Sequence, residues 1–242
     1  MRNMYLSVKV YRDIKYMLMT LQFFPGSLLR EQMVADKLGV SRTPVREAFQ
    51  RLAQEGWLQI GEGRRVMVSP VTVSDIDDIF HLRMLLELYA VRETFHRGKC
   101  RLLAGELDQI LSTMRGEGLD RVSFARADME FHSLFMKNVE NSRLSRFWKT
   151  LHEESSRIAI MTLPDRVATG MLSDRMASVL QEHTAIVNRL WEKDLDSTLR
   201  LLNDHLATSR DSLLCRMGIP ANDEDGAFDN ILDFKSVLSG AR

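Results

Sequence analysis

Apolar residues recur every three to four positions along most of the chain, a spacing typical of helices with one buried face. Near the N-terminus, a first stripe covers 10–21 and ends at Phe24-Pro25-Gly26, where proline and glycine favour a stop. A second segment covers 31–38, and a third follows Ser41. We therefore predict three helices, whose packing positions are Val10, Ile14, Met17, Leu18, Leu21, Met33, Val34, Leu38, Val45, Phe49 and Leu52.

The connection between the second and third helices has the residues of a tight turn. Gly39 can take the left-handed backbone conformation without a Cβ penalty. Ser41 is a favourable N-cap, and Pro44 falls in the first turn of the next helix, where a missing N–H costs little. This order of residues predicts a helix-turn-helix.

Two short β-prone runs come next, at 57–60 and 66–68. They flank Gly61-Glu62-Gly63-Arg64-Arg65, a glycine-rich and basic segment suited to the tip of a hairpin. Such a hairpin is the wing of a winged helix-turn-helix domain, which we assign to residues 1–70.

The rest of the chain has helical periodicity almost throughout, and strand alternation is absent. After a linker at 71–74, Ser74 and the acidic residues behind it are expected to begin a long helix. Short gaps between the helices favour antiparallel neighbours, so 75–217 is predicted to be an all-α helical bundle. Its helices are expected near 75–97, 101–115, 121–139, 142–160, 173–192 and 194–216.

Charge separates the same two regions, although the whole chain has a net charge of zero. Residues 1–70 hold 11 Lys and Arg against 6 Asp and Glu, whereas residues 71–242 hold 22 against 27. A basic module favours polyanion binding through counterion release, and an acidic bundle is suited to another task.

Composition points to a cytoplasmic protein. None of the apolar runs is long enough to cross a bilayer, so no membrane partner is expected, and the N-terminus lacks the features of a secretory signal. Cys100 and Cys215 are too few for a disulfide scaffold or a zinc ribbon and fit reduced thiols.

The outward face of the third helix can meet phosphates and base edges together. An ordinary amphipathic helix with a solvated charged face is the alternative interpretation, but the surrounding helices, the wing and the positive charge favour DNA recognition. The candidate DNA contacts are Ser41, Arg42, Thr43 and Arg46 on this helix and Arg64 and Arg65 in the wing.

Four residues of the bundle are candidate metal ligands. Asp128 and His132 are four apart on one helix and can hold one ion together. His183 and His205 lie at nearly equal distances from the joint near Lys193-Asp194, so they should face each other. Imidazole and carboxylate ligands suit zinc, nickel, manganese or iron and leave coordination positions for water or a carboxylate. The alternative is that the histidines are only structural.

Other polar residues of the bundle give weaker signals. His81 and His96 are interpreted as surface or structural residues, and His152 as a candidate for a layer behind the metal ligands. The spacing of Arg83 and Glu87 is also that of a simple intrahelical ion pair, but arginine can bind a carboxylate with two hydrogen bonds, so we keep Arg83, and less strongly Arg157, as effector contacts. The tail, 218–242, is expected to end in an amphipathic docking helix.

These segments also carry a family resemblance. From about 10 to 71, PGSLL, REQMVADKLGVSRTPVREAFQRLAQEGWLQI and the basic wing resemble the winged helix of GntR-family transcription regulators. From about 75 to 215, RADMEFHSLF, ENSRL and QEHTAIVNRLWEKDLDSTLRLLNDHL resemble the FCD effector domain of the FadR branch. The resemblance implies that Arg42 and Arg46 contact DNA. It also implies a metal on the four bundle ligands, zinc first, a small organic acid over it, and a homodimer on a palindromic operator.

The favoured hypothesis is therefore a repressor whose operator affinity depends on a small carboxylate at a bundle metal site. One alternative is a regulator of the same family whose bundle binds an acyl cofactor or no metal. A metal-dependent hydrolase is the alternative from another class, because an open coordination position can activate water.

Overall fold

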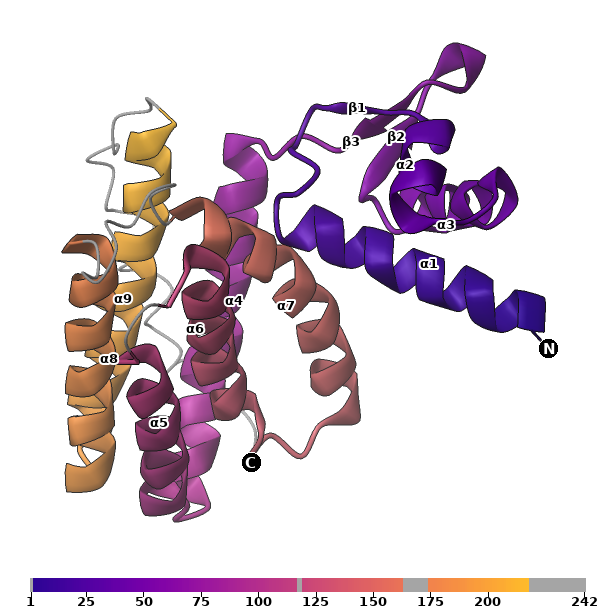
Figure 1. The fold of residues 1–242 in the computed structure, drawn as a ribbon. Coiled ribbons are helices and arrows are strands. Elements are labelled where there is room, and N and C mark those ends of the chain that lie inside the picture. Colours follow the sequence, from indigo (N-terminus) through magenta and orange to yellow (C-terminus); the bar gives the residue numbers. More distant parts are fainter. Residues whose placement is uncertain (1, 117–118, 163–173, 218–242) are drawn as a thin grey trace, which may run out of the picture.

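The computed structural model describes residues 2–116, 119–162 and 174–217. Figure 1 shows a small N-terminal domain at the upper right and a helical bundle at the left, with α1 and α7 adjacent where the two meet. Buried apolar residues form two separate clusters, centred on the two domains. The predicted division into a winged helix-turn-helix and an all-α bundle is confirmed.

The N-terminal domain has three helices and a three-stranded antiparallel sheet in the order β1-β3-β2. The predicted first helix is longer than expected, and β1 is an extra strand of two residues that pairs with the wing. The elements are α1 (Arg2–Met19), β1 (Leu28–Leu29), α2 (Glu31–Leu38), α3 (Arg42–Gln54), β2 (Leu58–Ile60), the 3-10 turn η1 (Glu62–Arg64) and β3 (Val66–Val68).

The helix-turn-helix has the local structure that its residues favour. Gly39 takes the left-handed conformation at φ 64°, and α3 turns Val45 and Phe49 into the core against α1. Two details differ from expectation. Ser41 stands at the N-cap position, but its side chain makes no capping hydrogen bond. Met33 is 44% exposed, because the buried face of α2 is formed by other residues of the helix.

The bundle contains the six predicted helices within the described residues, with ends that differ from the expected ones by up to three residues. The first begins at Val73 and not at 75, because Thr72, not Ser74, caps it in a reciprocal capping box with Asp75. The helices are α4 (Val73–His96), α5 (Cys100–Met114), α6 (Arg121–Met136), α7 (Ser142–Thr162), α8 (Asp174–Glu192) and α9 (Leu195–Arg216). The predicted docking helix at 218–242 lies outside the described residues.

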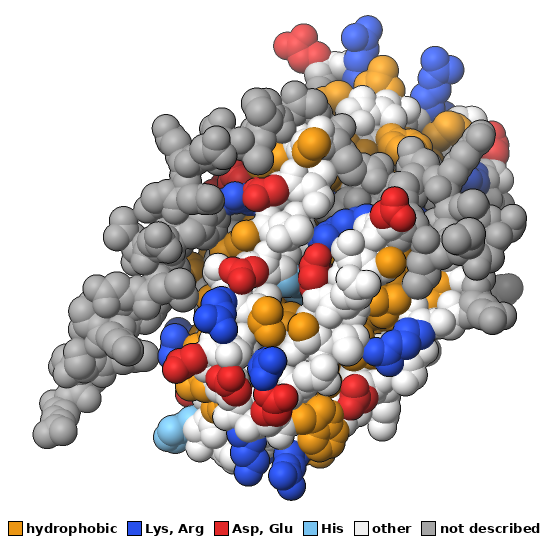
Figure 2. All heavy atoms as spheres, turned by 90° about the vertical axis from the view of Figure 1, so that its left-hand side faces the viewer, with side chains coloured by type: hydrophobic (Ala, Val, Ile, Leu, Met, Phe, Trp, Pro, Cys, Tyr) orange, Lys and Arg blue, Asp and Glu red, His pale blue; other side chains and the backbone are white. Residues whose placement is uncertain are grey.

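Acidic and basic side chains are interspersed on the bundle face that Figure 2 shows, and apolar side chains appear there in small groups. This face is unlike a continuous basic surface for DNA. None of the helices among the described residues is long and apolar enough to cross a membrane.

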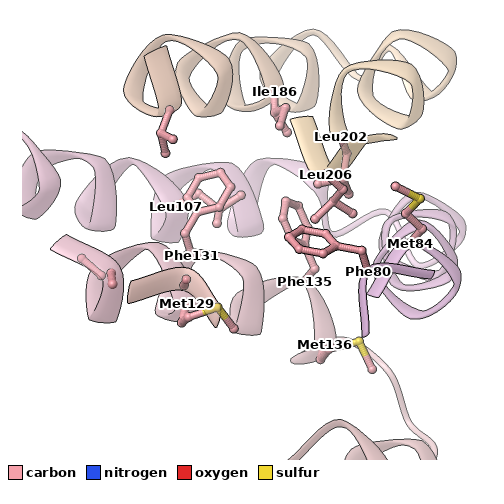
Figure 3. Close-up of a cluster of buried hydrophobic side chains, with 14 of the residues drawn as sticks. Phe80, Met84, Leu107, Met129, Phe131, Phe135, Met136, Ile186, Leu202 and Leu206 are labelled. Carbon is pink, nitrogen blue, oxygen red and sulfur yellow. The ribbon is translucent and has the colours of Figure 1, made fainter. Parts of the chain in front are cut away.

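The bundle core gathers around α6, which packs between α5 and α7 and also contacts α4. In Figure 3, Phe135 on α6, Phe80 on α4 and Leu206 on α9 point into one buried cluster. The reversal from α8 to α9 depends on Lys193, whose φ of 58° is left-handed and rare for a residue with a Cβ. This tight turn sets α8 and α9 side by side, so that His183 and His205 can both reach α6 across the core.

Candidate metal centre and DNA-binding surface

The four predicted donors of the bundle come together inside it. Asp128 and His132 project from α6, His183 from α8 and His205 from α9, and one donor atom of each lies within 4.8 Å of the others. Nε2 of His205 is 3.2 Å from Nε2 of both His132 and His183. Asp128 Oδ1 is 3.5 Å from His183 Nε2 and 4.0 Å from His132 Nε2.

These separations fit ligands that share one ion. Ligand atoms about 2.1 Å from a metal, at angles between a right angle and the tetrahedral angle, lie about 3.0 to 3.4 Å from each other. The two contacts that His205 Nε2 makes with the other imidazole nitrogens fall in this range, and the carboxylate oxygen lies farther out, at 3.5 and 4.0 Å from two of them. The set of three nitrogens and one oxygen therefore has the number and the kinds of donor that could hold one metal ion.

The carboxylates of Glu87 and Glu182 bond to the Nδ1 atoms of two of these histidines. The sequence did not indicate either contact. His132 Nδ1 is 2.5 Å from Glu87 Oε2, and His205 Nδ1 is 2.5 Å from Glu182 Oε2. A carboxylate accepts a hydrogen bond from Nδ1–H, so in a neutral imidazole held in this way the lone pair is left on Nε2. Both rings thus turn their acceptor nitrogens toward the same point.

Each of these carboxylates is in turn paired with an arginine. Arg83 Nε donates to Glu87 at 2.8 Å, and Arg175 donates to Glu182 at 3.0 Å and to Ser209 at 2.8 Å. The expected pair of Arg83 and Glu87 is therefore present, and both side chains are buried. Burial alone would raise the pKa of Glu87 and of Glu182, but the histidine partner of each, followed by its arginine, outweighs burial and lowers both pKa values.

His183 is held differently, by packing. Its ring is fully buried and stacks flat on Phe131, with ring centres 3.8 Å apart, and its Nδ1 has no hydrogen-bond partner among the described residues. Burial lowers the pKa of His183 well below its ordinary value and also lowers that of His205. These two imidazoles are therefore neutral near pH 7 and can offer lone pairs. Imidazole lone pairs and a carboxylate that point at one centre repel one another unless a cation lies between them.

A very small cavity adjoins three of the four donors, Asp128, His132 and His205. Its lining includes Asp128, Arg83, Arg175 and Ala159, and its volume is about 20 Å³, enough for roughly one water molecule. Arg83 Nη2 and Arg175 Nε are buried without hydrogen-bond partners in the described parts of the chain. The arginine that sequence analysis kept as an effector contact therefore lies at the site together with a second arginine that it missed.

The remaining polar candidates lie elsewhere. His152 on α7 bonds to Ser133 Oγ at 2.9 Å and is outside the group of four, although Ser133 is next to His132 on α6. Arg157 contacts the N-terminal domain and does not line the cavity beside the candidate donors. Its position therefore contradicts the prediction that it contacts an effector there. His96 is exposed, as expected, and His81 is only partly buried.

The side chains of α3 that are expected to bind DNA lie on the surface, and two of them, Arg42 and Arg46, share one carboxylate partner. Arg42 and Arg46 are 57% and 44% exposed, and both bond to Glu31 at the start of α2. Arg46 binds Glu31 through two nitrogens, each at 2.8 Å, and the bonds from Arg46 and Arg42 lower the pKa of Glu31 to about 2.

The other predicted contacts are compatible with the same surface. Ser41 and Thr43 are exposed at the start of α3, and Arg65 is exposed in the wing. Arg64 belongs to η1, but its side chain lies outside the described residues. The recognition helix and the wing tip therefore present polar and basic groups, and α3 turns its apolar residues inward.

Polar contacts also connect the two domains, and no sequence pattern indicates them. Lys15 on α1 lies 2.8 Å from Glu55, at the end of α3, and 2.6 Å from Glu153 on α7. Arg157 on α7 stacks over Trp57 and donates to the carbonyl oxygen of Ser69 at 3.4 Å. One side of α7 thus contacts the DNA-binding domain, and its Ala159 lines the cavity at the four donors.

A winged helix with exposed arginines at the start of α3, joined to a separate helical bundle, is the architecture of a DNA-binding transcription regulator. Comparison with known families agrees. Residues 6–68 match the family of bacterial regulatory proteins of the gntR type, and residues 78–208 match the FCD domain. The chain belongs to the GntR family of transcription regulators, in the group with an FCD domain.

Individual relatives point the same way. A probable D-xylose utilization operon transcriptional repressor from Paenarthrobacter nicotinovorans is 30% identical over 187 residues, covering 75% of this chain and 77% of the relative. The gluconate operon transcriptional repressor of Bacillus licheniformis is 25% identical over 182 residues, covering 74% and 73%. These proteins and families are regulators and not enzymes, which confirms the prediction of a regulator over the hydrolase alternative.

The fold is shared with solved structures. The Escherichia coli protein McbR/YncC superposes with a TM-score of 0.67 at 19% identity, covering 88% of this chain and 98% of that protein. At this level of identity the likeness concerns the fold alone.

Proposed function

We propose that this regulator is a repressor whose operator affinity is set by a small carboxylate bound at a divalent ion in the bundle. The convergence of Asp128, His132, His183 and His205 carries the proposal. Nitrogen and oxygen ligands in this number suit zinc best, with nickel, manganese and iron as alternatives. When bound, the ion would supply a Lewis-acid position for a ligand oxygen.

The residues around the donors favour an anionic ligand. Arg83 and Arg175 line the adjoining cavity, and each has a buried N–H group without a partner among the described residues. Buried polar groups of this kind are rarely left unpaired, and guanidinium groups bind carboxylates with good geometry. The relative that is named as the repressor of a gluconate operon supports a sugar acid or a comparable small acid, because gluconate is a carboxylate.

On the DNA side, we propose that a homodimer binds a palindromic operator with the recognition helices in the major groove. Winged helices of this type place the start of α3 against bases and phosphates and the wing against the adjacent backbone. The proposed contacts are Ser41, Arg42, Thr43 and Arg46 on α3, and Arg64 and Arg65 in the wing.

The cavity size suggests how binding in the bundle reaches the DNA-binding domain. The cavity has room for about one water molecule, and we propose that a ligand of several atoms enlarges it by displacing part of its wall. α7 supplies Ala159 to that wall and, on its other side, Glu153 to the contact with Lys15. We propose that α7 shifts on binding and alters this junction, which changes how the DNA-binding domain is held. A coupling of about 1 to 3 kcal/mol would change operator affinity by roughly 5- to 150-fold.

The decisive experiment is metal analysis of the full chain purified without a histidine tag. We expect about one ion per chain by mass spectrometry of the native protein and near-complete loss in the double variant His183→Ala, His205→Ala. The matched control is His96→Ala, because His96 is exposed on α4 and lies outside the group of four. Wild-type protein that stays metal-free after incubation with zinc, nickel and manganese would contradict the proposal and favour purely structural histidines.

A further inference from the structure

We propose that Glu87 and Glu182 are positioning residues that fix two of the three imidazoles and so set the metal affinity of the bundle. The inference rests on the proposed metal site and goes beyond it, because it assigns a role to residues that do not touch the ion. The proposal follows from one arrangement that occurs twice: an arginine bonds to a glutamate, and the glutamate bonds to Nδ1 of a ligand histidine.

The two arrangements come from different pairs of helices. Arg83 and Glu87 both lie on α4 and hold His132 on α6. Arg175 and Glu182 both lie on α8 and hold His205 on α9, where Arg175 also bonds to Ser209. Each glutamate therefore connects the helix that supplies it to another helix that supplies a ligand.

The chemical effect of each glutamate is to select one tautomer. A free neutral imidazole can carry its proton on either ring nitrogen, and the form with Nε2–H cannot bind a metal through Nε2. A carboxylate that accepts from Nδ1–H stabilises the form whose lone pair is on Nε2. The arginine donates to the same carboxylate and holds it in place, at 2.8 Å for Arg83 and 3.0 Å for Arg175. Both rings are thereby prepared for an ion before it arrives.

Burial argues against a purely structural role for the first pair. Glu87 is fully buried and Arg83 is 4% exposed, although removing two charges from water often costs more than their attraction returns. An apolar pair would fill this region of the core without that cost. Instead, the pair lies where His132 can donate a hydrogen bond to the carboxylate of Glu87.

The third imidazole provides an internal contrast. Nδ1 of His183 has no acceptor among the described residues, and its ring is fixed by stacking on Phe131. We therefore expect the tautomers of His132 and His205 to depend on their glutamates and that of His183 not to. A general loosening of the bundle would affect the tautomers of all three histidines. Tautomer selection by the glutamates would affect only His132 and His205, so the two explanations can be told apart.

Glu182 is the better residue for the test, because its side chain is 27% exposed and its removal leaves no closed cavity in the core. Glu182→Ala removes the acceptor, whereas Glu182→Gln retains an oxygen that can accept from Nδ1–H but lacks the charge. Glu192→Gln is the control, since Glu192 is on the same helix in an exposed pair with Arg189. Glu87→Gln is the matching variant for the buried arrangement.

Zinc affinity is measured by competition with a chromophoric chelator, and cobalt absorption spectra report the ligand geometry. We expect Glu182→Ala to bind zinc about 10- to 100-fold more weakly. Glu182→Gln should recover some of the loss, and Glu192→Gln should match wild type. Nitrogen-15 NMR of the imidazoles in metal-free protein should show the Nδ1–H form for His205 in wild type and a mixture of tautomers in Glu182→Ala, with His183 unchanged.

The outcomes separate the two proposals. Wild-type protein that binds none of the metals overturns the proposed metal site and this inference together. Wild type that binds zinc, with Glu182→Ala within about twofold of it and an unchanged His205 tautomer, overturns only the positioning role. Unfolding of Glu182→Ala, seen by circular dichroism, transfers the test to Glu182→Gln, which then has to bind zinc more weakly than both wild type and Glu192→Gln; equal affinity in all three overturns the positioning role.

Discussion

The candidate DNA-binding surface and the candidate metal centre hold their polar side chains in opposite ways. On the surface, Arg42 and Arg46 are exposed and share the single carboxylate of Glu31, with further donors left for DNA. In the bundle, the ligands are largely buried, and His132 and His205 each have a carboxylate of their own. Under the proposed function, the surface that adapts to DNA keeps few internal bonds, whereas the site that receives an ion has two of its imidazoles fixed before the ion binds.

Metal removal should produce the largest effect, because the proposed site lies within the core. A ligand present at 100 times its Kd stabilises the folded state by about 2.7 kcal/mol, and at 1,000 times by about 4.1 kcal/mol. We expect a strong chelator to lower the melting temperature of wild type by several degrees, measured by calorimetry. The double variant His183→Ala, His205→Ala should not respond to the chelator. An equal response in both proteins would show that the chelator acts elsewhere.

Loss of one recognition arginine should come next. We expect Arg46→Ala to weaken binding to an operator selected from random duplexes by about 1 to 3 kcal/mol, measured by fluorescence anisotropy at fixed salt. Arg101→Ala is the control, because Arg101 is an exposed arginine on α5 of the bundle. If Arg46→Ala retains wild-type affinity and sequence preference, the assignment of α3 as the recognition helix is wrong.

The junction between the domains should show a smaller but specific coupling. Lys15 and Glu153 are largely buried, at 13% and 27% exposure. We expect the double-mutant cycle of Lys15→Met and Glu153→Gln to give a coupling of about 0.5 to 3 kcal/mol in urea unfolding. The exposed pair of Arg189 and Glu192 should give less, about 0 to 1 kcal/mol. Equal coupling energies in the two pairs would contradict the expectation that the contact between Lys15 and Glu153 couples the domains more strongly than an exposed ion pair does.

The smallest effect concerns Glu31 and pH. Its pKa is lowered from 4.5 to about 2, so its contribution to stability is complete above about pH 4.5 and is lost as the pH falls toward 2. The difference in urea midpoint between wild type and Glu31→Gln should therefore shrink over this interval. A difference that stays constant between about pH 5 and pH 2 would contradict the pairing with Arg42 and Arg46.

Local pattern was enough to predict much of the architecture. Helical periodicity located all six bundle helices within the described residues, and Gly39 fixed the turn before α3. The face-to-face placement of His183 and His205 could be expected because a short turn at Lys193 makes their helices antiparallel. In these cases, spacing along one helix or across one turn determines the geometry.

Features that depend on contacts between distant segments were not predicted. Glu87 and Glu182 meet their histidines only after helices have packed, and a glutamate on a helix has no local sign of such a partner. The same holds for Lys15, which meets Glu153 across the domain junction. β1 was missed because two residues carry no periodicity, and they become a strand only by pairing with β3.

The small size of the cavity beside Asp128, His132 and His205 has a kinetic consequence for the proposed function. Because the cavity has room for about one water molecule, we expect a larger ligand to bind only when the surrounding helices move apart, so that its association falls below the rate set by diffusion. A regulator with such a ligand site would average over brief fluctuations in metabolite concentration. It would respond to a supply that lasts longer than the time the bundle needs to open.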